Sequence, residues 1–168
     1  MNTLIIYSSK TGFSLRYAQW LAETLNCRAI SFKERKTIKL TDYEKIILFG
    51  GLYAGNMSGF GWLKKQLPSL GGKRIAAVAV GCAPMGNPDL PESMEKLFGS
   101  TPEITGFYCQ GGLDYEHMSA VHRAMMAALR AALRGKPEMA EMLAVISHSF
   151  DGTNREYLAP VVQWANQT

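Results

Sequence analysis

The sequence predicts an α/β domain with a doubly wound, five-stranded parallel sheet of strand order 2-1-3-4-5. Strand and helix patterns alternate from the N-terminus, which is typical of consecutive βαβ units. Residues 45–50 and 74–80 are continuous apolar runs, and such runs indicate strands covered by helices on both faces. The chain has 168 residues, of which 47% are apolar and 19% charged. That size fits one domain over residues 1–168.

Each element follows from its own pattern. We expect strands at 3–7, 28–33, 45–50, 74–80 and 104–110, and helices at 14–26, 58–67 and 89–98. The second strand is the weakest, which favours a place at the edge of the sheet. Near the C-terminus, Thr153 and Glu156 have capping-box spacing and predict the start of a last helix. Pro160 then either kinks that helix or sets its true first turn.

The stretch from 111 to 152 interrupts this alternation and predicts a helical insertion after the fifth strand. It contains two helical patterns, separated at 135–137 by Gly-Lys-Pro. A helix over 118–134 would carry an apolar stripe on one side and three arginines on the opposite side. The stripe comprises Met118, Val121, Met125, Leu129 and Ala132, and the arginines are Arg123, Arg130 and Arg134. Three interpretations stay open: a peripheral membrane contact, a partner or a second copy as a homodimer, or packing on the chain's own domain.

A hydroxyl-rich turn follows the first strand and leads directly into a helix. Its residues are Ser9, Lys10, Thr11, Gly12, Phe13 and Ser14. Backbone N–H groups at such a turn and at the helix N-terminus favour an anion, and the hydroxyls add donors. The turn lacks both GxxxxGK[ST] and GxGxxG, which disfavours a nucleoside triphosphate loop and a dinucleotide site. We therefore expect it to bind a phosphate monoester.

Two further loops should reach the same edge of the sheet, because ligands of doubly wound sheets bind at the carboxyl ends of the strands. The loop after the third strand contains Gly51, Leu52, Tyr53, Ala54 and Gly55, and the loop after the fourth contains Cys82, Ala83, Pro84, Met85 and Gly86. Loops of this composition can bring backbone against a flat ring, with Tyr53 or Met85 as a packing face. Cys82 is better interpreted as a small buried side chain than as a redox thiol.

Composition excludes several other classes. Three cysteines without a CxxC pair indicate neither a disulfide framework nor a zinc site, and they suit a reducing cytoplasm. His117, His122 and His148 show no metal-ligand spacing, so we interpret them as surface or cap residues.

The start of the chain predicts a strand rather than a signal peptide. No window approaches the length of a transmembrane helix. The basic residues are scattered, which disfavours nucleic-acid binding.

The segment from Ser9 to Ser14 resembles the flavodoxin phosphate fingerprint, [ST]-x-T-G-x-[ST]. The chain is most similar to the flavodoxin-domain branch that includes menaquinone-dependent protoporphyrinogen dehydrogenase. There, too, a Gly-x-Leu-x-Tyr segment and a long helical insertion follow the fifth strand; here the segment is 111–115. The resemblance implies a flavodoxin-like fold with bound FMN. FMN is expected rather than FAD, because the turn suits a terminal phosphate and no adenosine-binding fingerprint is present.

Two classes of function follow from that resemblance. The first is an FMN-dependent oxidoreductase or electron carrier, working with a redox partner protein or a small-molecule electron donor or acceptor. Within this class the insertion favours an enzyme for a quinone-like or porphyrin-like substrate over a simple shuttle. The second is a non-catalytic binding or regulatory module on the same fold. A phosphorylated receiver is excluded, because Ser8-Ser9 and Gly50-Gly51 stand where it needs acidic residues.

Overall fold

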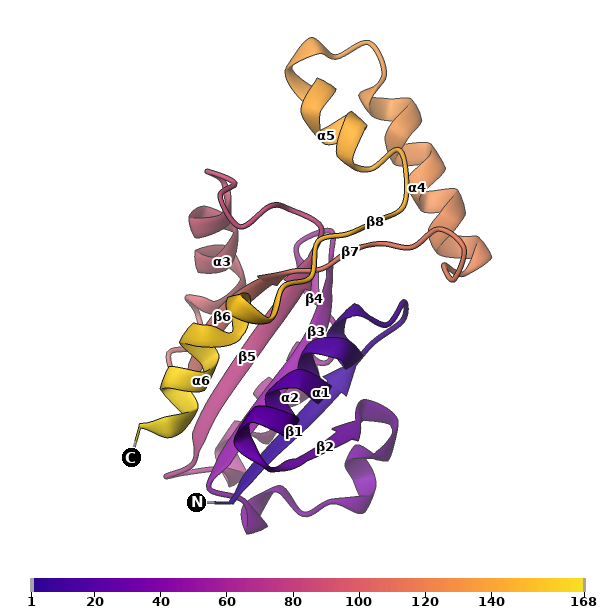
Figure 1. Cartoon of the computed structure of the whole chain (residues 1–168). Helices are drawn as coiled ribbons and strands as arrows, with labels where there is room; N and C mark the ends of the chain where they lie inside the picture. Colours follow the sequence, from indigo (N-terminus) through magenta and orange to yellow (C-terminus); the bar gives the residue numbers. More distant parts are fainter. Residues whose placement is uncertain (1, 168) are drawn as a thin grey trace.

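The computed structural model describes residues 2–167 and confirms the predicted α/β fold. Its main sheet is parallel and has the order β2-β1-β3-β5-β6 (Figure 1). The strands are β1 (Thr3–Ser8), β2 (Arg28–Ser31), β3 (Lys45–Tyr53), β5 (Arg74–Gly81) and β6 (Ile104–Gln110), and the short β4 (Asn56–Met57) pairs antiparallel with β3. Counting only the parallel strands, this is the predicted order 2-1-3-4-5. The weak second strand lies at the edge, as expected.

Helices cover both faces of this sheet. On one face, α1 (Phe13–Leu25) and α6 (Ala159–Asn166) bury Tyr17, Leu21 and Trp164 against β1, β3 and β5. On the other face, α2 (Phe60–Gln66) and α3 (Leu90–Phe98) bury Phe60, Leu63 and Phe98. Successive side chains of a strand point to opposite faces, so Ile5 belongs to the first core and Leu4 and Ile6 to the second.

The predicted capping box at Thr153 and Glu156 is wrong. The Thr153 hydroxyl instead donates to the Asp151 carboxylate at 2.6 Å, and Asn154 caps a 3-10 turn over Arg155–Leu158 by accepting from the Glu156 N–H. Pro160 lies in the first turn of α6, where its missing N–H costs no hydrogen bond. Pro160 was expected either to kink the last helix or to set its first turn, and the structure shows that it sets the first turn.

The insertion forms an arm beyond the carboxyl edge of the sheet, which we define as residues 112–151. A two-stranded antiparallel ribbon of β7 (Gly112–Leu113) and β8 (Phe150–Asp151) is its root. Two helices follow the ribbon, α4 (Ala120–Leu133) and α5 (Ala140–Val145), and Gly135 between them has a φ of 80°. Figure 1 shows the two helices standing well away from the sheet. Within residues 2–167 no helix is long and apolar enough to cross a lipid bilayer.

Candidate functional site

Three loops meet at the carboxyl edge of the sheet, beside the point where the strand order reverses. Ser8 at the end of β1 pairs with Gly50 of β3, which in turn pairs with Ala79 of β5. The Ser8 and Ser58 hydroxyls are 2.7 Å apart and link the β1 end to the segment after β4. In doubly wound sheets this switch point is the usual ligand crevice.

The turn after β1 has the geometry of an anion site. Gly12 has a φ of 97°, a conformation that favours glycine, and its N–H donates to the Ser9 hydroxyl oxygen at 3.1 Å. In the part of the chain that the structure describes, no side chain caps the first turn of α1, and that turn has no acidic residue. Its N–H groups and the positive end of the helix dipole are therefore available to an anion.

The other residues of this turn differ in how far their side chains are exposed to a ligand. Ser14 is buried at the start of α1, Thr11 is half-buried and Lys10 is exposed. A Cβ atom placed on Gly112, in the root of the arm, would lie 2.9 Å from Cζ of Phe13, so the half-buried Phe13 side chain packs against this root.

The segment after β3 is a hairpin rather than the predicted loop. Gly51, Leu52 and Tyr53 belong to β3, and Tyr53 pairs with Asn56 of β4. Ala54 and Gly55 make a two-residue turn with φ values of 46° and 76°. Positive φ at both turn positions matches the twist of paired strands. The sequence signal for this turn was the Ala-Gly pair, which is weaker than Asn-Gly.

The Tyr53 ring folds back over its own strand. A Cβ atom on Gly51 would lie 2.7 Å from the ring, so only glycine admits this arrangement. The Tyr53 side chain is still 39% exposed, and burial of the remainder raises the pKa of its hydroxyl. Tyr53 therefore offers an apolar ring at the rim of the crevice.

The loop after β5 faces the hairpin and is fixed by an aromatic residue of β6. The Tyr108 hydroxyl donates to the Ala83 carbonyl at 2.8 Å, and burial raises the pKa of this hydroxyl. Cys82 is half-buried, and burial raises the pKa of its thiol. Little thiolate is then present at neutral pH, which agrees with a packing role for Cys82. Met85 at the tip is 40% exposed.

A cavity of about 400 Å³ that is largely open to solvent lies between this loop and the arm. Its walls are Cys82, Pro84, Gln110, Ala144, Val145, His148 and Phe150. The first two belong to the loop after β5, and the last four belong to α5, the turn after it and β8. Sequence reasoning missed this cavity, because it joins the loop after β5 to a part of the arm about sixty residues further along the chain.

The arm also contacts the turn after β1 and the hairpin, through His122 in the first turn of α4. Lys10 Nζ donates to His122 Nε2 at 3.0 Å, and the Tyr53 ring stacks on the imidazole with centroids 5.7 Å apart. Nδ1 of His122 lies 2.7 Å from the Ser119 hydroxyl. His122 was expected to be a surface or cap residue, and no sequence signal linked it to Lys10.

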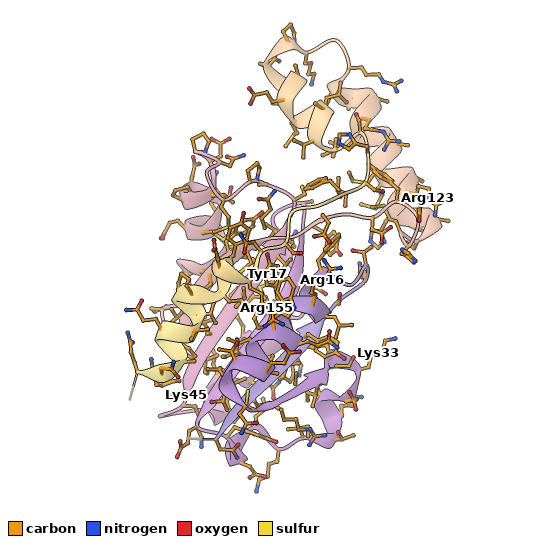
Figure 2. All side chains as sticks on the ribbon, viewed as in Figure 1. Arg16, Tyr17, Lys33, Lys45, Arg123 and Arg155 are labelled. Atoms are coloured by element: carbon orange, nitrogen blue, oxygen red, sulfur yellow. The ribbon has the colours of Figure 1, made fainter. Side chains whose placement is uncertain are left out.

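The root of the arm is tied to α1. The buried Tyr17 hydroxyl donates to the Gln110 carbonyl at 2.5 Å and accepts from the Asn154 N–H at 3.1 Å. Arg16, one residue earlier, forms an ion pair with Asp151 of β8. Figure 2 shows Arg16 and Tyr17 together beneath the root of the arm. Within the described chain, no group of His, Cys, Asp or Glu side chains is placed to bind a metal ion.

The fold and the site define a doubly wound α/β domain with a glycine-containing turn, free of side-chain caps, at the switch point of its sheet. The chain belongs to the flavodoxin domain family, whose model matches residues 4–140. A search of curated proteins finds no match.

Three of the solved structures with a similar chain illustrate the range of these matches. The Trp repressor binding protein from Bacillus subtilis is 16% identical, with 81% of this chain and 98% of that chain covered and a TM-score of 0.48. Oxidised flavodoxin 1 from Bacillus cereus is 16% identical, with 79% and 95% covered and a TM-score of 0.43. The Fusobacterium nucleatum flavodoxin bound to flavin mononucleotide is 17% identical, with 69% and 73% covered and a TM-score of 0.41.

Proposed function

We propose that this protein binds FMN at the carboxyl edge of its sheet and transfers electrons through it. The observation that carries the proposal is the turn from Ser9 to Ser14. There Gly12 has a positive φ, and the first turn of α1 is free of side-chain caps and acidic groups. Membership of the flavodoxin domain family supports the same assignment.

The residues present fit FMN. The Thr11 and Ser14 hydroxyls and the backbone N–H groups of 11–14 would hold the phosphate, with Ser9 closing the turn and Lys10 adding positive charge at its rim. The flavin ring would lie between the hairpin and the loop after β5. These contribute Gly51, Leu52, Tyr53, Ala54 and Gly55 on one side and Cys82, Ala83, Pro84, Met85 and Gly86 on the other. When bound, FMN supplies the redox chemistry, which the protein positions and shields.

This assignment predicts that the phosphate is the main anchor. Each hydrogen bond to a charged group contributes roughly 1.5–3 kcal/mol, so riboflavin, which lacks the phosphate, should bind at least ~100-fold more weakly than FMN. Titrating the apoprotein with each flavin, followed by quenching of flavin fluorescence, measures the ratio. Equal affinities would overturn the assignment of the turn.

We further propose that the electron acceptor or donor is a small apolar ring compound, quinone-like or porphyrin-like, as in the branch that the arm resembles. The cavity beside Cys82 and Pro84 supports this, since its walls are mainly apolar and only Gln110 and His148 offer polar groups. Ligand sites commonly combine such a wall with a few convergent polar groups. A redox partner protein is the other candidate for the electron acceptor or donor.

A pair of variants on α5 tests the cavity. Ala144 lines it, whereas Ala140, four residues earlier, is exposed and outside the lining. Ala144→Trp should slow oxidation of the reduced protein by a water-soluble quinone at least ~10-fold and leave FMN affinity unchanged, because a substrate pocket tolerates little lost volume. Ala140→Trp should change neither property. Wild-type rates in Ala144→Trp would show that electrons leave elsewhere.

A further inference from the structure

The outer face of α4 is apolar and uncovered. Val121 is 68% exposed, Met125 is 59% exposed and Leu129 is 41% exposed. Monomeric domains rarely leave large aliphatic side chains together in water, and such patches mark interaction surfaces. Within the described chain every strongly exposed large hydrophobic side chain lies in the arm or on the two loops at the same edge of the sheet. They are Tyr53, Met85, Val121, Met125, Leu129, Met139 and Met142.

Alanines complete this face. Ala120, Ala124, Ala127, Ala128, Ala131 and Ala132 are all exposed. The face that packs inward is narrower and centres on Met126 and Leu133, of which Leu133 is buried. With 3.6 residues per turn, the exposed apolar residues cover roughly 200° of the helix circumference. The predicted stripe through Val121, Met125 and Leu129 is therefore real, but it faces solvent and not the chain's own domain.

Positive charge borders the apolar face. Between 118 and 136 the sequence has four basic residues and no acidic one. Arg123 and Arg134 are exposed and lie beside the alanine side of the face. Arg130 is half-buried, with its guanidinium 5.0 Å from the centre of the Tyr115 ring, so the three arginines do not form one solvated face. The acidic residues nearest in sequence are Glu116, before α4, and Glu138, before α5.

We propose that α4 docks the arm on an anionic lipid surface. A helix with a wide apolar face and a basic margin lies in the plane of the headgroups, with its apolar side chains below them. Its 14 residues are too few to cross a bilayer. The charge disfavours a second copy as the occupant, because two α4 helices paired along this face would each carry the same positive charge and no acidic residue to pair with it.

Vesicle binding tests the proposal, with phosphatidylcholine vesicles compared with vesicles in which phosphatidylglycerol replaces a third of the lipid. The protein should co-sediment with the anionic vesicles at low salt. It should dissociate at about 0.5 M salt, where the Debye length falls well below ~8 Å. Removing two cations with R123Q/R134Q should weaken binding roughly 30-fold, at about fivefold for each surface cation. Removing apolar contact with V121S/M125S should weaken it at least ~10-fold.

The matched control is K33Q/K36Q, which removes the same charge from exposed residues outside the arm. Figure 2 shows Lys33 on the sheet domain and Arg123 on the arm. The control should bind like wild type, and all variants should keep their melting temperature and flavin affinity. Absence of binding to anionic vesicles at low salt would overturn the proposal. So would equal losses in K33Q/K36Q and R123Q/R134Q, or a lipid-free dimer that V121S/M125S converts to monomer.

Discussion

The Lys10 ammonium group donates a 3.0 Å hydrogen bond to Nε2 of His122, across 112 residues of chain. The same ammonium group lies 4.7 Å from the centre of the Tyr53 ring, which stacks on the imidazole. One contact thus joins the turn after β1, the hairpin after β3 and the first turn of α4. The arm is held against the proposed FMN site at this point as well as at its root.

Removing the imidazole should loosen the arm. His122→Ala loses an exposed hydrogen bond and a ring contact, and one such bond contributes about 0.5–1.5 kcal/mol. Trypsin cleavage after Arg123, Arg130 or Arg134 should then be roughly 2–10-fold faster. The control is His117→Ala, since His117 pairs only locally, with Asp114 at 2.7 Å. Equal cleavage of the two variants would show that the arm does not depend on the Lys10 contact.

The turn after β1 should be sensitive to small changes. Thr11→Ala should weaken FMN at least ~10-fold, because a hydrogen bond to a charged phosphate contributes roughly 1.5–3 kcal/mol. Gly12→Val should weaken it more, since a β-branched residue is strained at a φ of 97°. Thr37→Ala, at an exposed threonine away from the site, is the control. Wild-type affinity in folded Thr11 and Gly12 variants would place the phosphate elsewhere.

The Arg16–Asp151 pair should make stability depend on acid pH. Partial burial raises the pKa of Asp151, but hydrogen bonds from Thr153 and Arg16 outweigh it and hold the pKa below its usual range. A carboxylate with a depressed folded pKa stabilises the fold above the unfolded pKa of about 3.9. That stabilisation is lost as the pH falls through the folded value.

Urea unfolding between about pH 5 and pH 2.5 measures this loss. Asp151→Asn should unfold with a smaller pH dependence than wild type over this range. Asp42→Asn is the control, because the Asp42 carboxylate has no ion-pair partner among residues 2–167. An unchanged pH dependence in Asp151→Asn would contradict the contribution of the pair.

Lys45 should stabilise the far end of the sheet. Its side chain is 1% exposed, and Nζ donates to the carbonyls of Ala165 and Gln167 at 2.5 and 2.6 Å. Lys45→Met keeps the apolar volume but leaves both carbonyls without this donor, so we expect a loss of about 2 kcal/mol in unfolding free energy. Lys39→Met, at an exposed lysine, should have little effect. If Lys45→Met is more stable than wild type, burial of the ammonium group destabilises the fold by more than its two hydrogen bonds stabilise it.

Much of the fold could be predicted from the sequence, because burial on both faces of the sheet leaves a direct pattern. The run of 74–80 became β5, whose residues are almost all buried. The hairpin was missed because Gly50 and Gly51, which lie inside β3, have the composition of a loop, and only the turn at Ala54 and Gly55 closes the pairing. The capping box failed because Thr153 had a nearer partner in Asp151.

The candidate site likewise has one part that the sequence predicted and another that it did not. The turn from Ser9 to Ser14 is local in sequence, so its residue types and spacing were visible directly. His122, His148 and Phe150 reach the site only through the path of the arm. Their contacts depend on how the ribbon of β7 and β8 leaves the sheet, and no periodicity within the sequence encodes that direction.

The cofactor of the native protein tests the central claim most directly. Protein purified without added flavin should show the absorption bands of oxidised flavin. Denaturation should then release a compound with the mass of FMN. Release of FAD would contradict the phosphate-monoester site. If no flavin is found and none binds on reconstitution with FMN, the electron-transfer account is wrong, and a non-catalytic module on this fold becomes the better description.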